Sequence, residues 1–306
     1  MLTWKLWHAL RHPAYGNPVF EFAIITHNAP ERTKARQTRS GIFFTLYLMA
    51  AFGLTWFTKI WSIALFMIFF APLLVLALLL PVRGSGLAMQ VASIISEEQR
   101  RRRYDLLCLL PGGELHSNWL LCTAYLYREY RTRRYAAKLD YISRRSWLRR
   151  WGFLVAVGIV GALFGLMDEP VFVFLYAFFV ISWVVIDVLY VDRAQTTILG
   201  CMVGMLAPVY LPGQLDTRMV ALAVQATMQL MTYALVAILA ILVLPFGYIR
   251  LGIGWEWALV TEPVILLAAL VGLRELLIRQ GWRLLMRRLN ASPDILDTLA
   301  YAGRTR

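Results

Sequence analysis

Six apolar stretches constrain this fold more than any other feature of the sequence. The hydrocarbon core of a bilayer is about 30 Å thick, and a helix of about 20 apolar residues crosses it. Short or tilted helices widen that range in both directions. The chain is therefore predicted to be an all-α, polytopic integral membrane protein whose six transmembrane helices occupy residues 41–58, 60–82, 151–167, 170–190, 219–246 and 257–273.

The composition favours a membrane protein over a soluble domain. Hydrophobic residues make up 59% of the 306 residues and charged residues only 16%, against about 25% charged residues in soluble domains. The mean hydropathy is +0.60. A single membrane domain over residues 1–306 is the simplest organisation.

The lysines and arginines indicate which side of the membrane each segment occupies. Residues 1–40, 83–150 and 274–306 carry six, fourteen and seven of them, whereas the predicted external loops hold only Lys59 and Arg250. Positive residues in short loops remain on the cytoplasmic side. Both termini and the long loop are therefore predicted to be cytoplasmic, in a multi-pass protein of a bacterial or archaeal plasma membrane.

A seventh apolar segment, 195–211, contains Gly200, Gly204 and Pro208. If it crossed the membrane, the arginine-rich C-terminal segment would be exported, which the distribution of positive charge disfavours. We therefore interpret it as a non-crossing helix or as a cytoplasmic extension of the fourth span.

The N-terminus carries an amphipathic pattern. Leu2, Leu6, Trp7 and Leu10 fall on one face of a helix, with polar residues on the other. Next to a membrane, this pattern predicts a short helix lying in the interface.

The stretch ISEEQRRRRYDLLCLLPGG lies in the long cytoplasmic loop. Glu97 and Glu98 stand four residues before Arg101 and Arg102, the favourable order for ion pairs along a helix. A helix is therefore predicted here, and it ends at the Pro-Gly-Gly of residues 111–113. Beside a membrane, its arginines are expected to contact anionic lipid headgroups.

The same stretch resembles the cytoplasmic signature that follows the second transmembrane helix in permease subunits of ABC-type exporters. That signature reads Ile-Ser-x-Glu, three residues, then Gly-Thr-x-[Asp/Glu]-Leu-Leu-x-x-x-Pro. The sequence departs from it where Arg102 and Arg103 stand in place of Gly-Thr, and because this removes a flexible break, the helix is expected to run straight through. The matching residues are Ile95, Ser96, Glu98, Asp105, Leu106, Leu107 and Pro111.

The resemblance extends to the layout of an interfacial N-terminal helix and six spans. It implies the transmembrane subunit of an export system, paired with a second permease as a homo- or heterodimer. A coupling helix would dock on a separate P-loop ATPase subunit, which would bind ATP and Mg, while this chain binds no cofactor. The residues assigned to ATPase coupling are Glu98, Asp105, Leu106, Leu107 and Pro111. Because the sequence has no GxxxxGK[ST] motif, the chain itself is not expected to be an enzyme.

An alternative function is a structural or assembly subunit of a larger membrane complex, with a permease-like fold but no transport activity. The replacement of Gly-Thr by Arg102-Arg103 favours it, because an altered coupling helix need not fit an ATPase groove. The sequence leaves both functions open.

Two acidic residues within the predicted spans are candidate intramembrane polar sites. An aspartate in a span costs about 2.5 kcal/mol or more on insertion scales. Asp187 lies near the cytoplasmic end of the fourth span, where a pair with Arg193 or contact with interfacial water is the simpler explanation. Glu262, followed by Pro263, lies near the external end of the sixth span, in a translocation path or at the interface.

Neither a metal site nor nucleic-acid binding is indicated. The three cysteines and four histidines show no ligand spacing. Tyrosines alternate with arginines in residues 117–150, a pattern that could stack nucleobases. Beside a membrane, the same residues suit an interfacial helix, and this interpretation is favoured.

Overall fold

The computed structural model describes residues 1–11, 17–26, 82–109, 113–132, 156, 170–211, 216–252 and 255–291. Every regular element in these ranges is a helix, which confirms the all-α class predicted for this part of the chain. One helix covers residues 82–100. The other elements are α1 (Leu2–Arg11), α2 (Pro18–Thr26), α5 (Tyr104–Cys108), α6 (Gly113–Thr132), α8 (Pro170–Tyr210), α9 (Thr217–Ile238), η2 (Leu239–Val243), α10 (Leu244–Leu251) and α11 (Trp255–Arg288).

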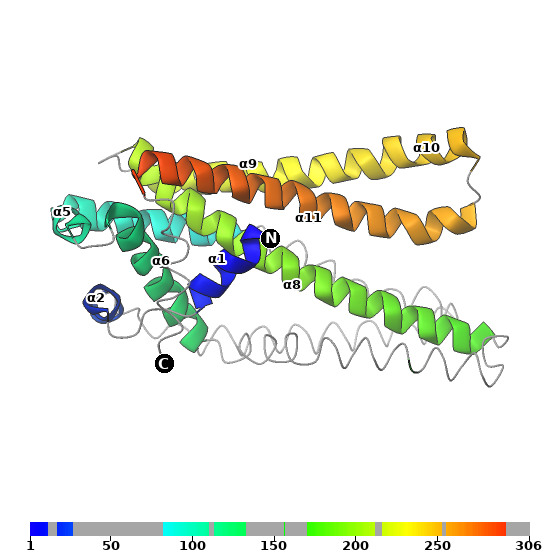
Figure 1. Ribbon diagram of the computed structural model, residues 1–306, viewed down its shortest axis with the longest axis horizontal. Helices are drawn as coiled ribbons and strands as arrows, with labels where there is room; N and C mark the ends of the chain where they lie inside the picture. Colours follow the sequence, from blue (N-terminus) through cyan, green and yellow to red (C-terminus); the bar gives the residue numbers. More distant parts are fainter. Residues whose placement is uncertain are drawn as a thin grey trace, which may run out of the picture.

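A long helical hairpin extends from one end of the molecule. α9, the π-helical turn η2 and α10 follow one another along a single rod, and α11 returns beside it (Figure 1). The rod ends at Gly252, whose φ of 64° is left-handed. Glycine adopts this conformation without the steric cost that a side chain would add, so it is the usual residue at such a helix end.

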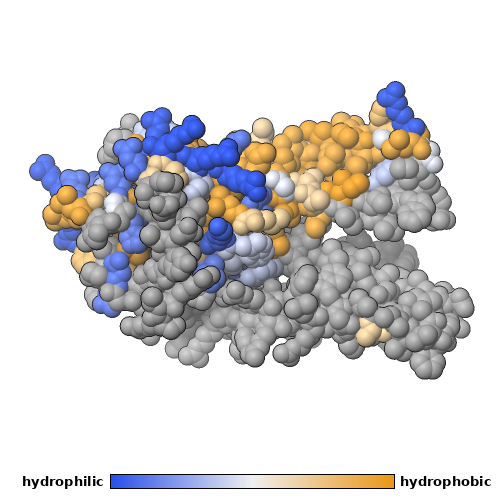
Figure 2. All heavy atoms as spheres, viewed as in Figure 1, coloured by the Kyte–Doolittle hydropathy of each residue, from blue (hydrophilic) through white to orange (hydrophobic). Residues whose placement is uncertain are grey.

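We call the rod Thr217–Leu251 the apolar helix. Among the described residues it is the one helix long and apolar enough to cross a membrane, and only 6% of its most apolar window is buried. The core helix of a soluble protein would be mostly buried, so this exposure distinguishes the apolar helix from one. Figure 2 shows the continuous apolar surface along α9 and α10. Its large exposed side chains include Leu230, Leu235, Ile238, Ile241, Phe246 and Ile249.

The predicted spans are represented unevenly in the described ranges. Residues 219–246 lie within the apolar helix, and 257–273 lie within α11. Residues 41–58, and nearly all of 60–82 and 151–167, lie outside the described residues. Six membrane crossings therefore stay a prediction.

α8 joins two segments that the sequence left separate. Residues 195–211 continue the helix that begins at Pro170, as the predicted extension of the fourth span requires. With 41 residues, α8 is about 62 Å long at 1.5 Å per residue. This is about twice the thickness of a bilayer core, so a helix of this length extends beyond one.

The buried core lies at the end of the molecule away from α10. We call this region the packed end; it contains α1, α2, residues 82–100, α5, α6 and the C-terminal halves of α8 and α11. Its centre includes Ile95, Ile198 and Leu285, all completely buried. Trp119 of α6 and Trp282 of α11 meet edge to face, with ring centroids 5.8 Å apart. This geometry is the preferred one for aromatic pairs.

Small residues allow α8 to approach the helix of residues 82–100 closely. A Cβ atom on Gly200 would lie 2.8 Å from the carbonyl oxygen of Gly84, and one on Gly204 would lie 2.7 Å from Cβ of Val91. Any side chain at these two positions would force the helices apart. Gly200 and Gly204 therefore serve helix packing in the structure.

α1 packs its apolar face on other helices, and its place in a membrane interface stays a prediction. Leu6, Trp7 and Leu10 are buried, and the helix packs on α6, α8 and α11. The apolar face that predicts an interfacial helix is thus covered by protein. Periodicity identified the face correctly, but it carries no information on whether lipid or another helix covers it.

Glu275 of α11 caps the N-terminus of α1. One carboxylate oxygen accepts a hydrogen bond from the amide of Leu2 at 2.7 Å. The other accepts the amide of Thr3 at 3.4 Å and the Thr3 hydroxyl. A carboxylate at this position satisfies amides that have no partner inside the helix and suits the helix dipole. This contact joins the first helix of the described chain, α1, to the last, α11.

Candidate functional site

The helix of residues 82–100 ends in a Schellman motif. The amide of Arg102 donates to the carbonyl of Gln99 at 3.1 Å, and the amide of Arg103 donates to the carbonyl of Glu98 at 3.2 Å. Arg102 has a φ of 55°. A left-handed residue at this point is the defining feature of the motif, and glycine usually occupies it.

The expectation that the helix runs straight through Arg102 and Arg103 is therefore wrong. The chain turns at Arg102, and α5 begins at Tyr104. Losing glycine did not remove the turn, because the two hydrogen bonds and the packing of Tyr104 hold an arginine in the left-handed conformation. The left-handed residue, Arg102, stands at the position that carries Gly in the resembled signature.

α5 projects at the far end of the packed end, opposite α10 (Figure 1). Asp105 is exposed, Leu106 and Leu109 have 67% and 81% of their surface exposed, and Leu107 is half-buried. Figure 2 shows apolar residues flanked by hydrophilic ones at this end. We call the exposed residues Arg100, Arg102, Arg103, Leu106 and Leu109 the tip surface.

The five predicted coupling residues do not share one environment. Asp105 and Leu106 are exposed, whereas Glu98 is completely buried and its carbonyl holds the turn at Arg103. Pro111 lies outside the described residues. Glu98 therefore belongs to the support of α5, and Leu109, which the sequence analysis did not select, joins Leu106 on the outside.

α6 holds α5 in place through two hydrogen bonds. The Ser117 hydroxyl donates to the carbonyl of Leu107 at 2.6 Å. The Asn118 amide donates to the hydroxyl of Tyr104 at 2.9 Å. Tyr104 is buried, and burial raises the pKa of its hydroxyl, so it stays neutral. A short helix of five residues thus has a fixed position on the packed end.

Cys108, on the same helix, carries no sign of reactivity. Burial raises the pKa of its thiol to about 11, with Glu114 adding to the effect. The thiolate, which is the nucleophile and metal ligand, is therefore scarce at neutral pH. Among the described residues, no group of three or more His, Cys, Asp or Glu side chains could hold a metal ion.

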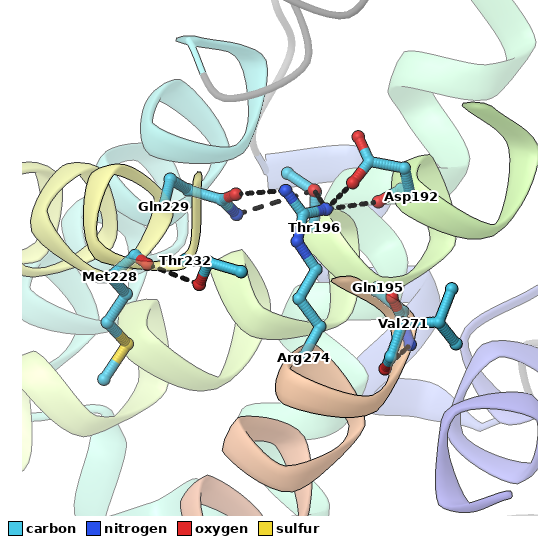
Figure 3. Close-up of polar contacts among 8 residues, drawn as sticks. All are labelled: Asp192, Gln195, Thr196, Met228, Gln229, Thr232, Val271 and Arg274. Atoms are coloured by element: carbon cyan, nitrogen blue, oxygen red, sulfur yellow. Dashed lines mark hydrogen bonds and ion pairs between the residues drawn. The ribbon is translucent and has the colours of Figure 1, made fainter. Parts of the chain in front are cut away.

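A second polar site lies where the packed end meets the hairpin. We call it the Arg274 hub (Figure 3). The guanidinium of Arg274 forms an ion pair with Asp192 of α8, and both side chains are almost completely buried. Nη1 also donates to Thr196 Oγ1 at 2.8 Å. Nη2 donates to Gln229 Oε1 of α9 at 2.7 Å.

The hub joins three long helices through one side chain. Arg274 extends from α11 toward α8 and α9, and its guanidinium lies 5.1 Å from the ring centre of Tyr233. Nearby, the Gln195 amide donates to the carbonyl of Val271 at 3.2 Å. Buried charges are expensive unless they are paired and hydrogen-bonded. The hub is therefore a point at which α8, α9 and α11 must keep one mutual arrangement.

The sequence analysis did not identify the hub. Arg274 stood at the start of the basic tail, and Asp192 lies just after the fourth predicted span. A charge next to a span normally belongs to the solvated flank, so only the tertiary contact distinguishes these residues. One signal was present: Gln225, Gln229 and Thr232 place polar side chains along one buried face of an otherwise apolar helix.

The two predicted intramembrane sites lie on α8 and α11, two of the helices that meet at the hub. Asp187 falls within α8, in a part whose side chains lie outside the described ones, and Glu262 of α11 is half-buried. The role of either residue in a translocation path stays a prediction.

Comparisons with protein-family models, with curated proteins and with solved structures find no match to this chain.

Proposed function

We propose that this chain is the multi-pass transmembrane subunit of an ABC-type export system in the cell membrane. It would pair with a second permease and couple to ATP hydrolysis by a separate P-loop ATPase subunit. The observation that carries this proposal is α5, a short helix that exposes Leu106 and Leu109 beyond a left-handed turn at Arg102. The turn falls at the Gly of the resembled coupling signature.

The apolar helix supports the membrane part of the proposal. Its exposed leucine, isoleucine and phenylalanine side chains would be unfavourable in water over this length. At 35 residues, it is about 52 Å long, more than a bilayer core of about 30 Å requires. In this proposal its α10 side lies in the bilayer and its first turns project toward the cytoplasm.

The contacts between α5 and the hub suggest how motion would be transmitted. A movement of α5 would be passed to α6 through Ser117 and Asn118. α6 would pass it to α11 through Trp119 and Trp282. α11 would then act on α8 and α9 at Arg274. Packed cores respond to such displacements by switching between discrete arrangements rather than by deforming continuously.

The test is purification of the tagged chain from its native membrane in mild detergent, with mass spectrometry of the proteins that remain bound. We expect a stoichiometric P-loop ATPase. Leu106→Asp should remove it, because an aspartate cannot enter an apolar pocket without a desolvation cost. The matched control is Leu284→Asp, an exposed leucine on α11, which should retain the ATPase.

A partner set without an ATPase would overturn the proposal. It would favour the alternative of a structural or assembly subunit. Retention of the ATPase by Leu106→Asp, with unchanged ATP turnover of the complex, would place the coupling contact elsewhere.

A further inference from the structure

We infer that the tip surface docks into an acidic groove of the partner protein, so that the partner is selected by charge as well as by shape. The inference rests on the proposed function only for the identity of that partner as an ATPase. The juxtaposition that carries it is three arginines, without a side-chain partner among the described residues, beside two exposed leucines at a hydrogen-bonded turn.

The charges of the tip surface are not neutralised within the described part of the chain. Arg101 is engaged by Glu97, with Nη2 and Oε1 3.0 Å apart. Arg100, Arg102 and Arg103 are exposed, and no hydrogen bond or ion pair of their side chains is present among the described residues. Between residues 100 and 109, Asp105 is the single acidic side chain. The exposed Glu114 of α6 also acts on Cys108 of α5. Three arginines against these two carboxylates leave the tip surface with a net positive charge.

The backbone gives these charges a fixed geometry. The Schellman hydrogen bonds hold Arg102 and Arg103 at the turn, and Ser117 and Asn118 hold α5 behind it. A pre-organised surface loses less conformational entropy on binding than a loose loop. Arginine is also suited to an interface, because its planar guanidinium pairs with a carboxylate through two parallel hydrogen bonds.

The position of the tip surface favours a protein partner over a lipid surface. α5 lies beyond the C-terminal end of α11, at the opposite end of the molecule from α10. Arg274 and Arg288 are 14 positions apart and therefore lie about 21 Å apart along α11. The headgroup region of a leaflet is only about 5–8 Å deep, from a total thickness of 40–45 Å and a core of about 30 Å. With the apolar helix in the bilayer, the tip surface lies past the headgroups.

Two features define the groove that would accept this surface. It needs an apolar floor for Leu106 and Leu109, and carboxylates at its rim for Arg100, Arg102 and Arg103. A permease with Gly-Thr at this turn has no positive charge at these two positions. An ATPase that binds such a permease would therefore not need those carboxylates. The arginines would thereby select a dedicated partner, because mismatched charges at a rim act against the wrong complex.

The experiment uses the full-length chain purified with its bound partner from the native membrane. The test variant is Arg100→Glu with Arg103→Glu, which leaves the left-handed Arg102 in place. The matched control is Arg283→Glu with Arg287→Glu, two exposed arginines of α11. A milder variant, Arg100→Gln with Arg103→Gln, guards against misfolding, and the thermal midpoint of every variant is recorded.

We expect the tip reversal to lower the affinity for the partner about tenfold or more, since rim charges set association and its salt dependence. The glutamine variant should give a smaller loss, and the control none. Binding of the unmodified chain should weaken as ionic strength rises. Cross-linking identifies a partner carboxylate that lies against the tip surface. Replacing that residue with lysine should restore binding of the Arg100→Glu, Arg103→Glu chain.

Several outcomes separate this inference from the proposed function. If the partner lost on charge reversal has no P-loop, the acidic groove stands and the export function fails. If a P-loop partner is lost with Leu106→Asp but withstands charge reversal and salt, the export function stands and the acidic groove is overturned. The inference is also overturned if reversal changes only the preference for phosphatidylserine over phosphatidylcholine in nanodiscs.

Discussion

The packed end and the apolar helix use the same kinds of residue in opposite ways. Ile95, Ile198 and Ile278 of the packed end have no exposed surface, whereas Ile241 and Ile249 of the apolar helix expose 72% and 81% of theirs. In the packed end, protein covers the aliphatic side chains. In the proposed function, lipid or a second permease covers those of the apolar helix. Hydrophobicity alone therefore does not say what a side chain will contact.

The polar residues teach the complementary lesson. The packed end holds buried polar side chains, and the apolar helix also buries three polar side chains, Gln225, Gln229 and Thr232. Gln229 contacts Thr196 of α8 and Arg274 of α11. The Arg274 hub lies at the boundary between the two regions. A substitution that disrupts the Arg274 hub is therefore the most severe test of the comparison.

The largest effect is expected from Arg274→Met. The substitution leaves Asp192 buried without its ion pair, and removing one partner of a buried pair costs about 3–5 kcal/mol. The free energy of unfolding, or the thermal midpoint in detergent, measures the loss. The exposed Arg283→Met on the same helix should have no measurable effect. If the double variant Arg274→Met with Asp192→Leu is no more stable than the single one, the ion pair is not the cause.

The second effect separates two strongly exposed aliphatic side chains, Ile241 and Leu109. Ile241→Lys should make the free energy of membrane insertion of the apolar helix less favourable by about 3 kcal/mol, because lysine at the centre of a span is disfavoured. Leu109→Lys, at a residue that is 81% exposed on α5, should leave insertion unchanged. A glycosylation-site insertion assay measures both. Equal behaviour of the two variants would mean that the apolar helix does not lie in the bilayer.

A smaller effect is expected from Glu275→Gln, which weakens the cap that Glu275 forms on the N-terminus of α1. Burial raises the pKa of Glu275, but the hydrogen bonds from Thr3, Leu2 and Arg279 more than offset this, so the net pKa is lowered. A carboxyl with a lowered folded pKa stabilises the protein at neutral pH, and the contribution is lost as pH falls through that pKa.

We therefore expect a loss of about 1–2 kcal/mol at pH 7 for Glu275→Gln, in the range of hydrogen bonds to charged groups. The difference from the unmodified chain should shrink in acid, as the glutamate itself becomes protonated. Thermal midpoints measured across the acidic range provide the check. A difference that is constant with pH would contradict the role of the carboxylate charge.

The smallest effect, and the single gain, is expected from Arg102→Gly. A left-handed conformation costs a residue with a side chain about 1 kcal/mol or more, and glycine adopts it freely. The thermal midpoint should rise accordingly. Arg103→Gly, at a residue with φ of −89°, should bring no gain. A fall on Arg102→Gly would show that the arginine side chain stabilises the turn by contacts of its own.

Much of the helical architecture was predictable from local patterns. The run 219–246 indicated a long apolar helix. Residues 195–211 were interpreted as a non-crossing helix or as an extension of the fourth predicted span, and in α8 they continue the helix that begins at Pro170. Leu106 and Leu107 of α5 were selected as contact residues by resemblance; Leu106 is exposed and Leu107 is half-buried, and their role as contacts stays a prediction. These features depend on side-chain periodicity and residue type over a few turns, which the sequence contains directly.

By itself, then, the sequence determined which segments are helical and apolar, and where positive charge accumulates. Only the tertiary structure decided what covers the apolar face of α1, that Glu98 is buried, and that Arg274 meets Asp192. The physical reason is that burial and ion pairing depend on contacts between residues far apart in the chain. Arg274 and Asp192 are 82 positions apart, and no local pattern records that they share one buried site.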